Sequence, residues 1–116
     1  RLGELERALV SFERALALDP DSSLAHLNLA IVLTRLGRPE EAEPHLEAAG
    51  SLRGDPSARN RLGVAYASAG QVDRAEAMLR ELISEYPDYP SPRRNLAALL
   101  RRQGRTEEAA KLEEKS

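Results

Sequence analysis

The sequence predicts an all-α protein, and three observations carry that prediction. Leucine and alanine, which are strong helix formers, supply 19 and 18 of the 116 residues. Valine, isoleucine and threonine, which favour strands, number only eight together. Small residues also recur at an interval of about 34 residues, which is typical of a two-helix unit repeated along the chain. Because aromatic residues make up only 3%, the core must form by close packing of alanine and leucine between helices.

Glycine marks the repeat most clearly, because four of the seven glycines follow this interval to within one position. These are Gly3, Gly37, Gly70 and Gly104. The same step relates Ala8, Ala42, Ala75 and Ala109, and it relates Phe12, Leu46 and Leu79. We expect the alanines to let two helices approach closely and the large residues to fill the space between successive hairpins. One unit cannot bury its apolar face alone, so stacking of units supplies the core.

Caps, prolines and glycines define the expected helices in chain order. Asp21-Ser22 is a candidate N-cap, while Asp55-Pro56 and Ser91-Pro92 combine an N-cap with a proline in the first turn. Three of the repeating glycines fall between the two helices of a unit, where a left-handed turn costs glycine least. The expected helices are 4–18, 23–36, 39–51, 56–69, 72–85, 91–103 and 106–114.

The segment 39–54 is predicted to be the least stable part of the stack. Pro44 lies inside the expected helix, where it removes one backbone donor and crowds the carbonyl four residues earlier. We expect a slight bend or a shifted helix start there, and no break. The one-residue deletion in the repeat falls in Gly50-Ser51-Leu52-Arg53-Gly54, whose two glycines should end the helix and loosen the linker.

The repeating residues resemble the tetratricopeptide repeat family. The third unit matches best, with Leu62-Gly63, Tyr66, Ala75, Leu79 and Pro87. The resemblance covers essentially the whole chain, as the second half of a repeat (1–22), two full repeats (23–55 and 56–89) and a degraded terminal repeat (90–116). It implies a right-handed superhelical solenoid of antiparallel helix pairs that binds a protein or peptide.

In the family that the chain resembles, the first helix of each unit lines a concave groove for an extended peptide. Asparagine can both donate to and accept from a peptide backbone, and arginine suits a carboxylate. The nominated residues are Asn28, Asn60 and Asn95 for the backbone, Arg61, Arg94 and Arg101 for an acidic group, and Leu27, Ile31 and Val64 for apolar contact.

Two comparisons with subgroups leave the binding mode open. The run from Ala25 to Ala30 looks like the asparagine-ladder repeats of the protein O-linked N-acetylglucosamine transferase, but Arg61 interrupts the ladder in the third unit. The alternative is that these asparagines are ordinary solvent-facing residues. Asn28 and Arg61 match two positions of the carboxylate-clamp subgroup. That subgroup is nevertheless disfavoured, because Ser57 stands where it has a lysine.

Charge narrows the class of partner. The formal net charge of −2 argues against nucleic acid, which calls for a basic footprint. The charge is uneven, with a net −4 over residues 1–55 and +2 over residues 56–116. An acidic or C-terminal peptide would suit the arginine-rich end. The alternative is that arginine is simply the usual cation of this protein and keeps its surface solvated.

Neither a catalytic site nor a metal or cofactor site is indicated. There is no cysteine, no glycine-rich phosphate loop, and only two histidines, His26 and His45, which we expect to be partly buried or at the rim of the packing. No apolar run approaches the length of a membrane span. The absence of cysteine is compatible with the cytoplasm, which is slightly favoured, or with the periplasm.

The sequence therefore predicts a protein-interaction module that is not an enzyme. Two alternatives remain: a substrate-recruiting arm of a larger enzyme, and a homo-oligomerisation module. The second would use the N-terminal helix, whose apolar face should be incompletely covered and seek a partner. The residues of that face are Leu2, Leu5, Leu9 and Phe12.

Overall fold

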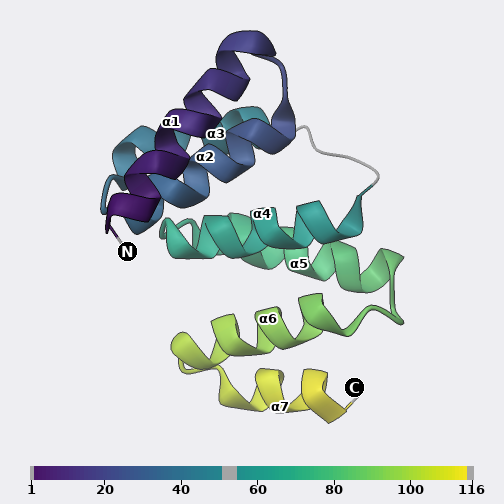
Figure 1. Cartoon of the computed structure of the whole chain (residues 1–116). Coiled ribbons are helices and arrows are strands. Elements are labelled where there is room, and N and C mark those ends of the chain that lie inside the picture. The colour runs from purple at the N-terminus through teal and green to yellow at the C-terminus, as the bar shows by residue number, and fades with distance from the viewer. Residues whose placement is uncertain (1, 51–54, 115–116) are drawn as a thin grey trace. The chain divides into compact units, whose positions relative to one another are not determined.

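The computed structural model describes residues 2–50 and 55–114, and these form seven α-helices and no strand. The helices are α1 (Leu2–Leu18), α2 (Ser23–Arg35), α3 (Pro39–Ala49), α4 (Pro56–Ser68), α5 (Val72–Glu85), α6 (Pro90–Arg102) and α7 (Thr106–Glu114) (Figure 1). Every boundary lies within two residues of the sequence-based prediction. The all-α helical repeat is thus confirmed, while the right-handed superhelix stays a prediction.

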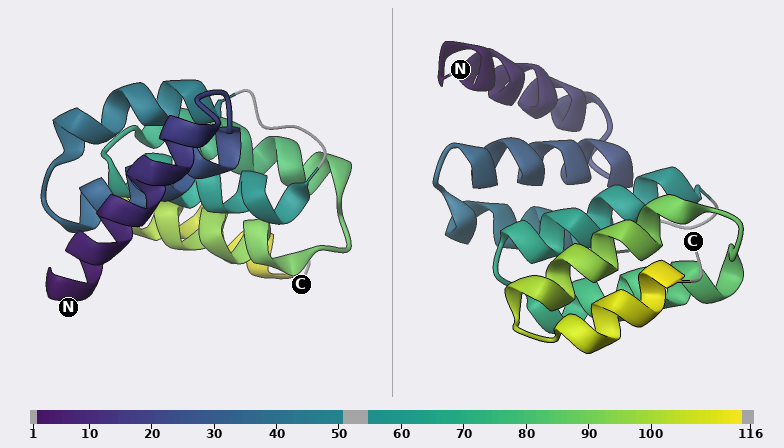
Figure 2. Two further views of the ribbon diagram at one scale, coloured as in Figure 1. Left: turned by 45° about the horizontal axis from the view of Figure 1, so that its top comes forward. Right: turned by 90° about the horizontal axis from the view of Figure 1, so that it is seen from below.

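The chain divides into two compact units, residues 1–54 and residues 55–116. In the first unit, α2 packs against both α1 and α3 and lies between them (Figure 2). In the second unit, α4 pairs with α5 and α6 pairs with α7, while α6 also contacts both α4 and α5. The second unit therefore contains two complete hairpins stacked on each other, which places the first helices of the two hairpins side by side.

Helix starts follow the side-chain caps at two of the three expected places. The Ser22 hydroxyl accepts from the backbone N–H of Ala25 at 3.1 Å, and the Asp55 carboxylate accepts from the N–H groups of Ser57 and Ala58. The expectation that Ser91 caps α6 was wrong, because α6 begins at Pro90. Proline already has the φ of a first helical residue, and it needs no N–H partner there.

The turn inside each hairpin ends the first helix at a glycine with positive φ. At Gly70, φ is 84°, its N–H donates to the Ala67 carbonyl, and the Gln71 N–H donates to the Tyr66 carbonyl at 2.8 Å. This pair of bonds is a Schellman motif, which satisfies the last carbonyls of α4. Gly37 and Gly104 repeat the geometry with a φ of 78° each. Gly3 does not, because it lies within the first turn of α1.

The core consists of the repeating alanines and leucines, as predicted. Ala42, Ala75, Ala109 and Leu46 are fully buried, and Leu79 is only 1% exposed. Where α4 packs against α5, a Cβ added to Gly63 would lie 3.0 Å from a methyl carbon of Leu79. Helix α1 contrasts with the others, because it contains no buried residue.

The segment 39–54 was predicted to bend or shift at Pro44 and to end early. Helix α3 starts at Pro39, continues through Pro44 and ends at Ala49, with Gly50 as its C-cap. The proline therefore does not break the helix, as expected. The proposed linker deletion falls mainly on residues 51–54, which lie outside the described residues, and the low stability of the segment stays a prediction.

Candidate functional site

The candidate site is the exposed surface of the two neighbouring helices α4 and α6 in the second unit. A side-chain hydrogen bond joins them, in which the Nδ2 of Asn95 donates to the Oδ1 of Asn60 at 3.0 Å. Asn60 is only 7% exposed, whereas Asn95 is half-buried. The bond joins two helices that also contact each other, so their outward-facing side chains form one surface.

Exposed side chains follow a helical stripe along each of these helices, at spacings of three and four residues. We call this surface the α4/α6 face. It consists of Ser57, Arg61, Val64 and Ser68 on α4 and Arg94, Ala98, Arg101 and Arg102 on α6. Val64, which is 40% exposed, supplies an apolar contact in the middle of the stripe on α4.

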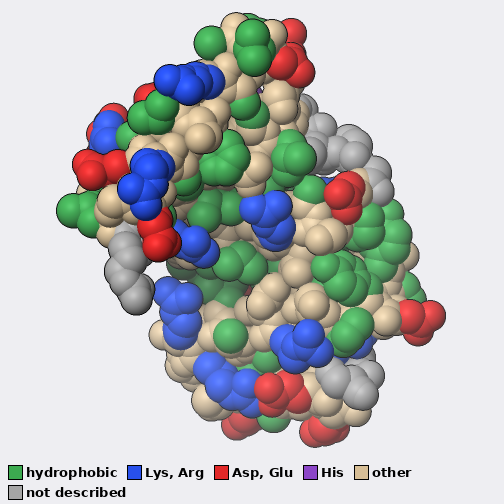
Figure 3. All heavy atoms as spheres, viewed as in Figure 1, with side chains coloured by type: hydrophobic (Ala, Val, Ile, Leu, Met, Phe, Trp, Pro, Cys, Tyr) green, Lys and Arg blue, Asp and Glu red, His purple; other side chains and the backbone are tan. Residues whose placement is uncertain are grey.

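Charge is segregated by helix in this unit. Helices α4 and α6 together carry six arginines and no acidic residue, whereas α5 and α7 carry eight acidic residues. Figure 3 shows blue side chains among hydrophobic ones over α4 and α6. The net charge of the whole chain conceals this arrangement. Four of these six arginines, Arg61, Arg94, Arg101 and Arg102, are exposed, so the α4/α6 face presents a positive surface.

The six arginines differ in how far their guanidinium groups reach the surface. Arg59 is buried and its guanidinium bonds to Glu81 at 2.5 Å and to Glu85 at 2.9 Å. Arg101 forms a two-pronged ion pair with Glu113, which lowers the pKa of that carboxyl. Arg94 and Arg61 are both exposed, and Arg94 donates to the Ser91 hydroxyl at 3.2 Å. Arg101 and Arg102 are exposed as well, so exposure alone does not select among the four. Arg61 on α4 and Arg94 on α6 form a pair of candidates that spans both helices.

The structure separates the nominated binding residues into two sets. Asn60, Arg61, Val64, Arg94, Asn95 and Arg101 lie together on α4 and α6, while Leu27, Asn28 and Ile31 lie on α2 in the first unit.

Two of the nominated residues are corrected by their burial. Leu27 is fully buried, so it offers no exposed apolar contact. Asn60 is also buried, and its carbonyl accepts from Asn95, so its structural role is to join two helices. Both mistakes have one cause. Spacings of three and four residues show which side chains share one side of a helix, but they do not show whether a neighbouring helix covers that side.

One position of the repeat carries a basic residue in three successive units, which sequence reasoning missed. His26, Arg59 and Arg93 occupy this position, where the family often has tryptophan. Arg59 and Arg93 are buried and His26 is half-buried. The repeat interval alone could have identified them, because it places both arginines at the position of His26.

The two histidines form a pair between α2 and α3. Their Nδ1 atoms lie 2.9 Å apart, and the Nε2 of His26 lies 2.9 Å from the Pro20 carbonyl. The Pro20 carbonyl can only accept, so the Nε2 of His26 carries a proton, and in the neutral form of His26 its Nδ1 accepts from the Nδ1–H of His45. Burial, and secondarily the neighbouring His26, lowers the pKa of His45.

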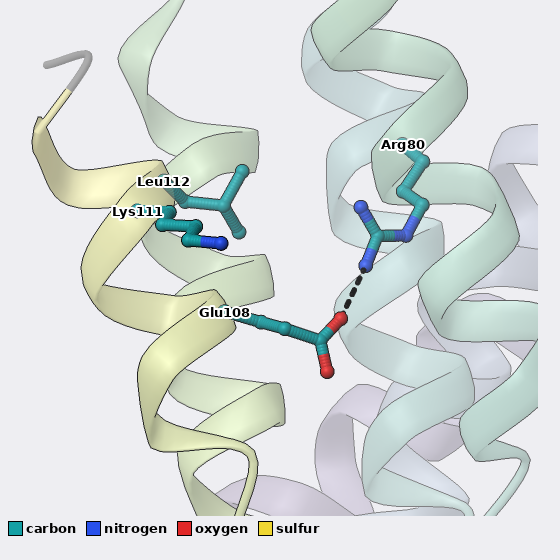
Figure 4. A pocket seen from close by; sticks show the side chains of 4 residues that line it. All are labelled: Arg80, Glu108, Lys111 and Leu112. Carbon is teal, nitrogen blue, oxygen red and sulfur yellow. Dashed lines mark ion pairs between the residues drawn. The ribbon is translucent and has the colours of Figure 1, made fainter.

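A small hollow between α5 and α7 has a volume of about 180 Å³ and is lined by Arg80, Glu108, Lys111 and Leu112 (Figure 4). Arg80 and Glu108 approach to 3.6 Å across it. Arg105 bonds to both Glu108 and Glu76 and thereby lowers the pKa of both carboxyls. Two of the four lining residues, Arg80 and Glu108, thus belong to an ion-pair network that links the two hairpins.

Within residues 2–50 and 55–114, no three histidine or acidic side chains are grouped closely enough to hold a metal ion. None of the described helices combines the length and the apolar character needed to cross a bilayer.

Stacked helical hairpins that repeat at about 34 residues define a helical-repeat scaffold of the kind that mediates protein–protein interaction. The sequence profile of the tetratricopeptide repeat family matches residues 1–62 and 66–112. The chain therefore belongs to the tetratricopeptide repeat family.

Solved structures with the same fold include fragment 41-end of MamA from Desulfovibrio magneticus RS-1, which is 25% identical with a TM-score of 0.77. The alignment covers 98% of this chain and 65% of that one, so this chain spans less than two thirds of that structure. A MamA labelled AMB-1 is 27% identical with a TM-score of 0.74, and the alignment covers 97% of this chain and 68% of that one. TTC0263, a thermophilic tetratricopeptide repeat protein of Thermus thermophilus, is 31% identical with a TM-score of 0.69, covering 84% and 50%. No curated protein matches.

Proposed function

We propose that this chain is a protein-interaction module that binds an extended acidic peptide segment on the α4/α6 face. The observation that carries the proposal is the charge segregation: α4 and α6 contain no acidic residue, and four of their six arginines are exposed. Arginine forms two parallel hydrogen bonds with a carboxylate, and exposed guanidinium groups on two adjacent helices can hold two acidic side chains at once.

The proposed contacts divide by chemistry. Arg61 and Arg94 take carboxylates of the peptide. Val64 and Ala98 give an apolar strip on the same surface. Asn95 holds the peptide backbone, because its Nδ2 is used by Asn60 while no hydrogen bond to its Oδ1 is found within residues 55–114. The Oδ1 can therefore accept from a peptide N–H.

Binding to a peptide array of equal-length acidic, neutral and basic sequences tests this proposal. We expect the acidic peptides to bind and the variant Arg61→Ala with Arg94→Ala to weaken that binding by roughly tenfold or more, since two charge-assisted contacts are lost. Arg7→Ala with Arg14→Ala is the matched control, because it removes the same charge from exposed positions on α1. Equal loss in both variants, or equal binding of a single-stranded oligonucleotide, would refute an acidic-peptide site.

A second candidate function is self-association through α1, favoured by its incomplete burial. Leu2 is 66% exposed, and Leu5, Leu9 and Phe12 are only half-buried. We expect sedimentation to show a dimer that weakens when Leu2 and Leu9 are changed to Gln. A monomer at high concentration would refute this candidate and leave the α4/α6 proposal unaffected.

A further inference from the structure

The two histidines of the chain meet across the hairpin of α2 and α3, and their contact depends on protonation. The Nδ1 atoms of His26 and His45 lie 2.9 Å apart, and the rings stack with their planes 29° apart. A hydrogen bond between two ring nitrogens needs one that donates and one that bears a lone pair. The neutral pair meets this condition, since the Pro20 carbonyl holds the proton of His26 on Nε2 and leaves a lone pair on its Nδ1.

Protonation acts on this contact in two steps. One added proton still leaves one bare Nδ1 in the pair, so the hydrogen bond persists and becomes charge-assisted. A second proton places an N–H on both Nδ1 atoms, which then point at each other while two positive charges repel in a half-buried site. The contact between the rings must then open. The bond from His26 to Pro20 persists, because a protonated ring still donates from Nε2.

The charged groups around the pair do not remove this repulsion. Glu13 on α1 favours the protonated form of His45, but burial and His26 act against that form, and the pKa of His45 is lowered. Glu41, one turn before His45 on α3, is held by Arg38 through two hydrogen bonds of 2.6 Å each. These two carboxylates therefore do not compensate a second charge on the pair.

The pair lies away from the turn that joins α2 to α3. That turn is at Gly37, whereas His26 lies near the start of α2 and His45 lies in the second half of α3. Pro44, next to His45, also removes one backbone hydrogen bond of α3. Loss of the histidine contact should therefore loosen α3 and leave the turn at Gly37 in place.

We propose that the His26–His45 pair is an acid-sensitive latch, which holds α3 against α2 near neutral pH and releases it when both rings are protonated. The release is confined to the first unit, because the chain has only these two histidines. The equivalent position of the second unit carries Arg59 and Arg93, which stay charged over this range. The latch uses no residue of the α4/α6 face, so this proposal and the binding proposal can fail independently.

Amide hydrogen exchange, with rates corrected for the intrinsic effect of pH, tests the latch. We expect the protection of α3 to fall roughly tenfold or more between about pH 7 and about pH 5, since a difference of one bound proton shifts the opening equilibrium about tenfold per pH unit. Protection of α5, whose unit contains no histidine, should change much less and serves as the internal reference. No change in α3, or equal changes in α3 and α5, would overturn the proposal.

Two variants separate the histidine pair from other causes. His45→Asn places an amide N–H close to the place of Nδ1–H, so it can donate to His26 without gaining a charge. His26→Gln cannot gain a charge either, and it still has a donor for the Pro20 carbonyl. In both variants the pH-dependent loss of α3 protection should disappear, whatever the protection at neutral pH. A loss that persists in either variant would show that another group causes it, and the proposal would be wrong.

Discussion

Replacing Gly70 by alanine tests the hairpin geometry on which the repeat depends. The backbone of Gly70 has a φ of 84°, in the left-handed region, and an added Cβ would meet no heavy atom within 4 Å. The cost of Gly70→Ala is therefore backbone strain alone, about 1–2 kcal/mol. The lower entropy of the unfolded alanine chain offsets about 0.4–1 kcal/mol of this. We expect a net loss of about 1 kcal/mol.

Urea unfolding followed by far-UV circular dichroism measures this loss as a lower midpoint at an unchanged slope. Two controls isolate the cause. Gly3→Ala, at a helical position with open space around it, should change stability by no more than about 0.5 kcal/mol. Gly70→Asn should lose less than Gly70→Ala, because asparagine tolerates the left-handed region better. A neutral or stabilising Gly70→Ala would refute the assigned role of the repeating glycine.

Three further outcomes follow from the contacts. Asn95→Ala should lower the free energy of unfolding by about 1–3 kcal/mol, because it leaves the side-chain carbonyl of Asn60 buried without a partner. In a double-mutant cycle with Asn60→Ala, the two losses of stability should be non-additive. Additivity within about 0.3 kcal/mol would contradict this. The pKa of His45 in the folded chain is lowered from 6.5, so just below pH 6.5 the unfolded chain binds more protons than the folded chain does. The free energy of unfolding should therefore fall as pH falls through this range. If His45→Gln has the same dependence of stability on pH as the wild type, this prediction is wrong. The pKa of Glu76 is lowered from 4.5, so its contribution to the free energy of unfolding is present above pH 4.5 and is lost as pH falls through the pKa of the folded chain. In an NMR titration, Arg105→Gln should raise the pKa of Glu76. An unchanged pKa would exclude Arg105 as the cause of the shift.

The seven helices could be predicted because their determinants are local. Glycine at the hairpin turns, Ser22 and Asp55 as caps, and helix-forming leucine and alanine each act within a few residues. The exception at Ser91 is also local, since Pro90 and Pro92 both suit a first turn and the sequence did not decide between them. Local rules are thus sufficient to predict where each helix begins and ends to within two residues.

The candidate site was less predictable because it depends on pairing between helices. Arg101 was nominated for an external carboxylate, but Glu113 holds it from a position 12 residues later on another helix. Asn60 was placed on a binding surface, but α6 supplies Asn95 to cover and bond it. Neither contact follows from spacings of three or four residues. The missed Arg59 differs, because the repeat interval alone would have aligned it with His26.

An ion-pair network links the two hairpins of the second unit. Arg105, at the start of α7, reaches back to Glu76 on α5 as well as to Glu108 on its own helix. Each exposed pair is worth little alone, but a network shares the cost of ordering its side chains. Acidic residues of α5 and α7 are used in this way, which leaves α4 and α6 as the positive surface.

The measurement that tests the central claim most directly is an NMR titration of the chain with an acidic peptide from the array. If the chain binds such a segment on the α4/α6 face, the largest amide shift changes should fall at and around Arg61, Val64, Arg94 and Ala98. They should disappear in the variant Arg61→Ala with Arg94→Ala. Shift changes confined to α1, α5 or α7, or changes that persist in that variant, would contradict the assignment of the binding site.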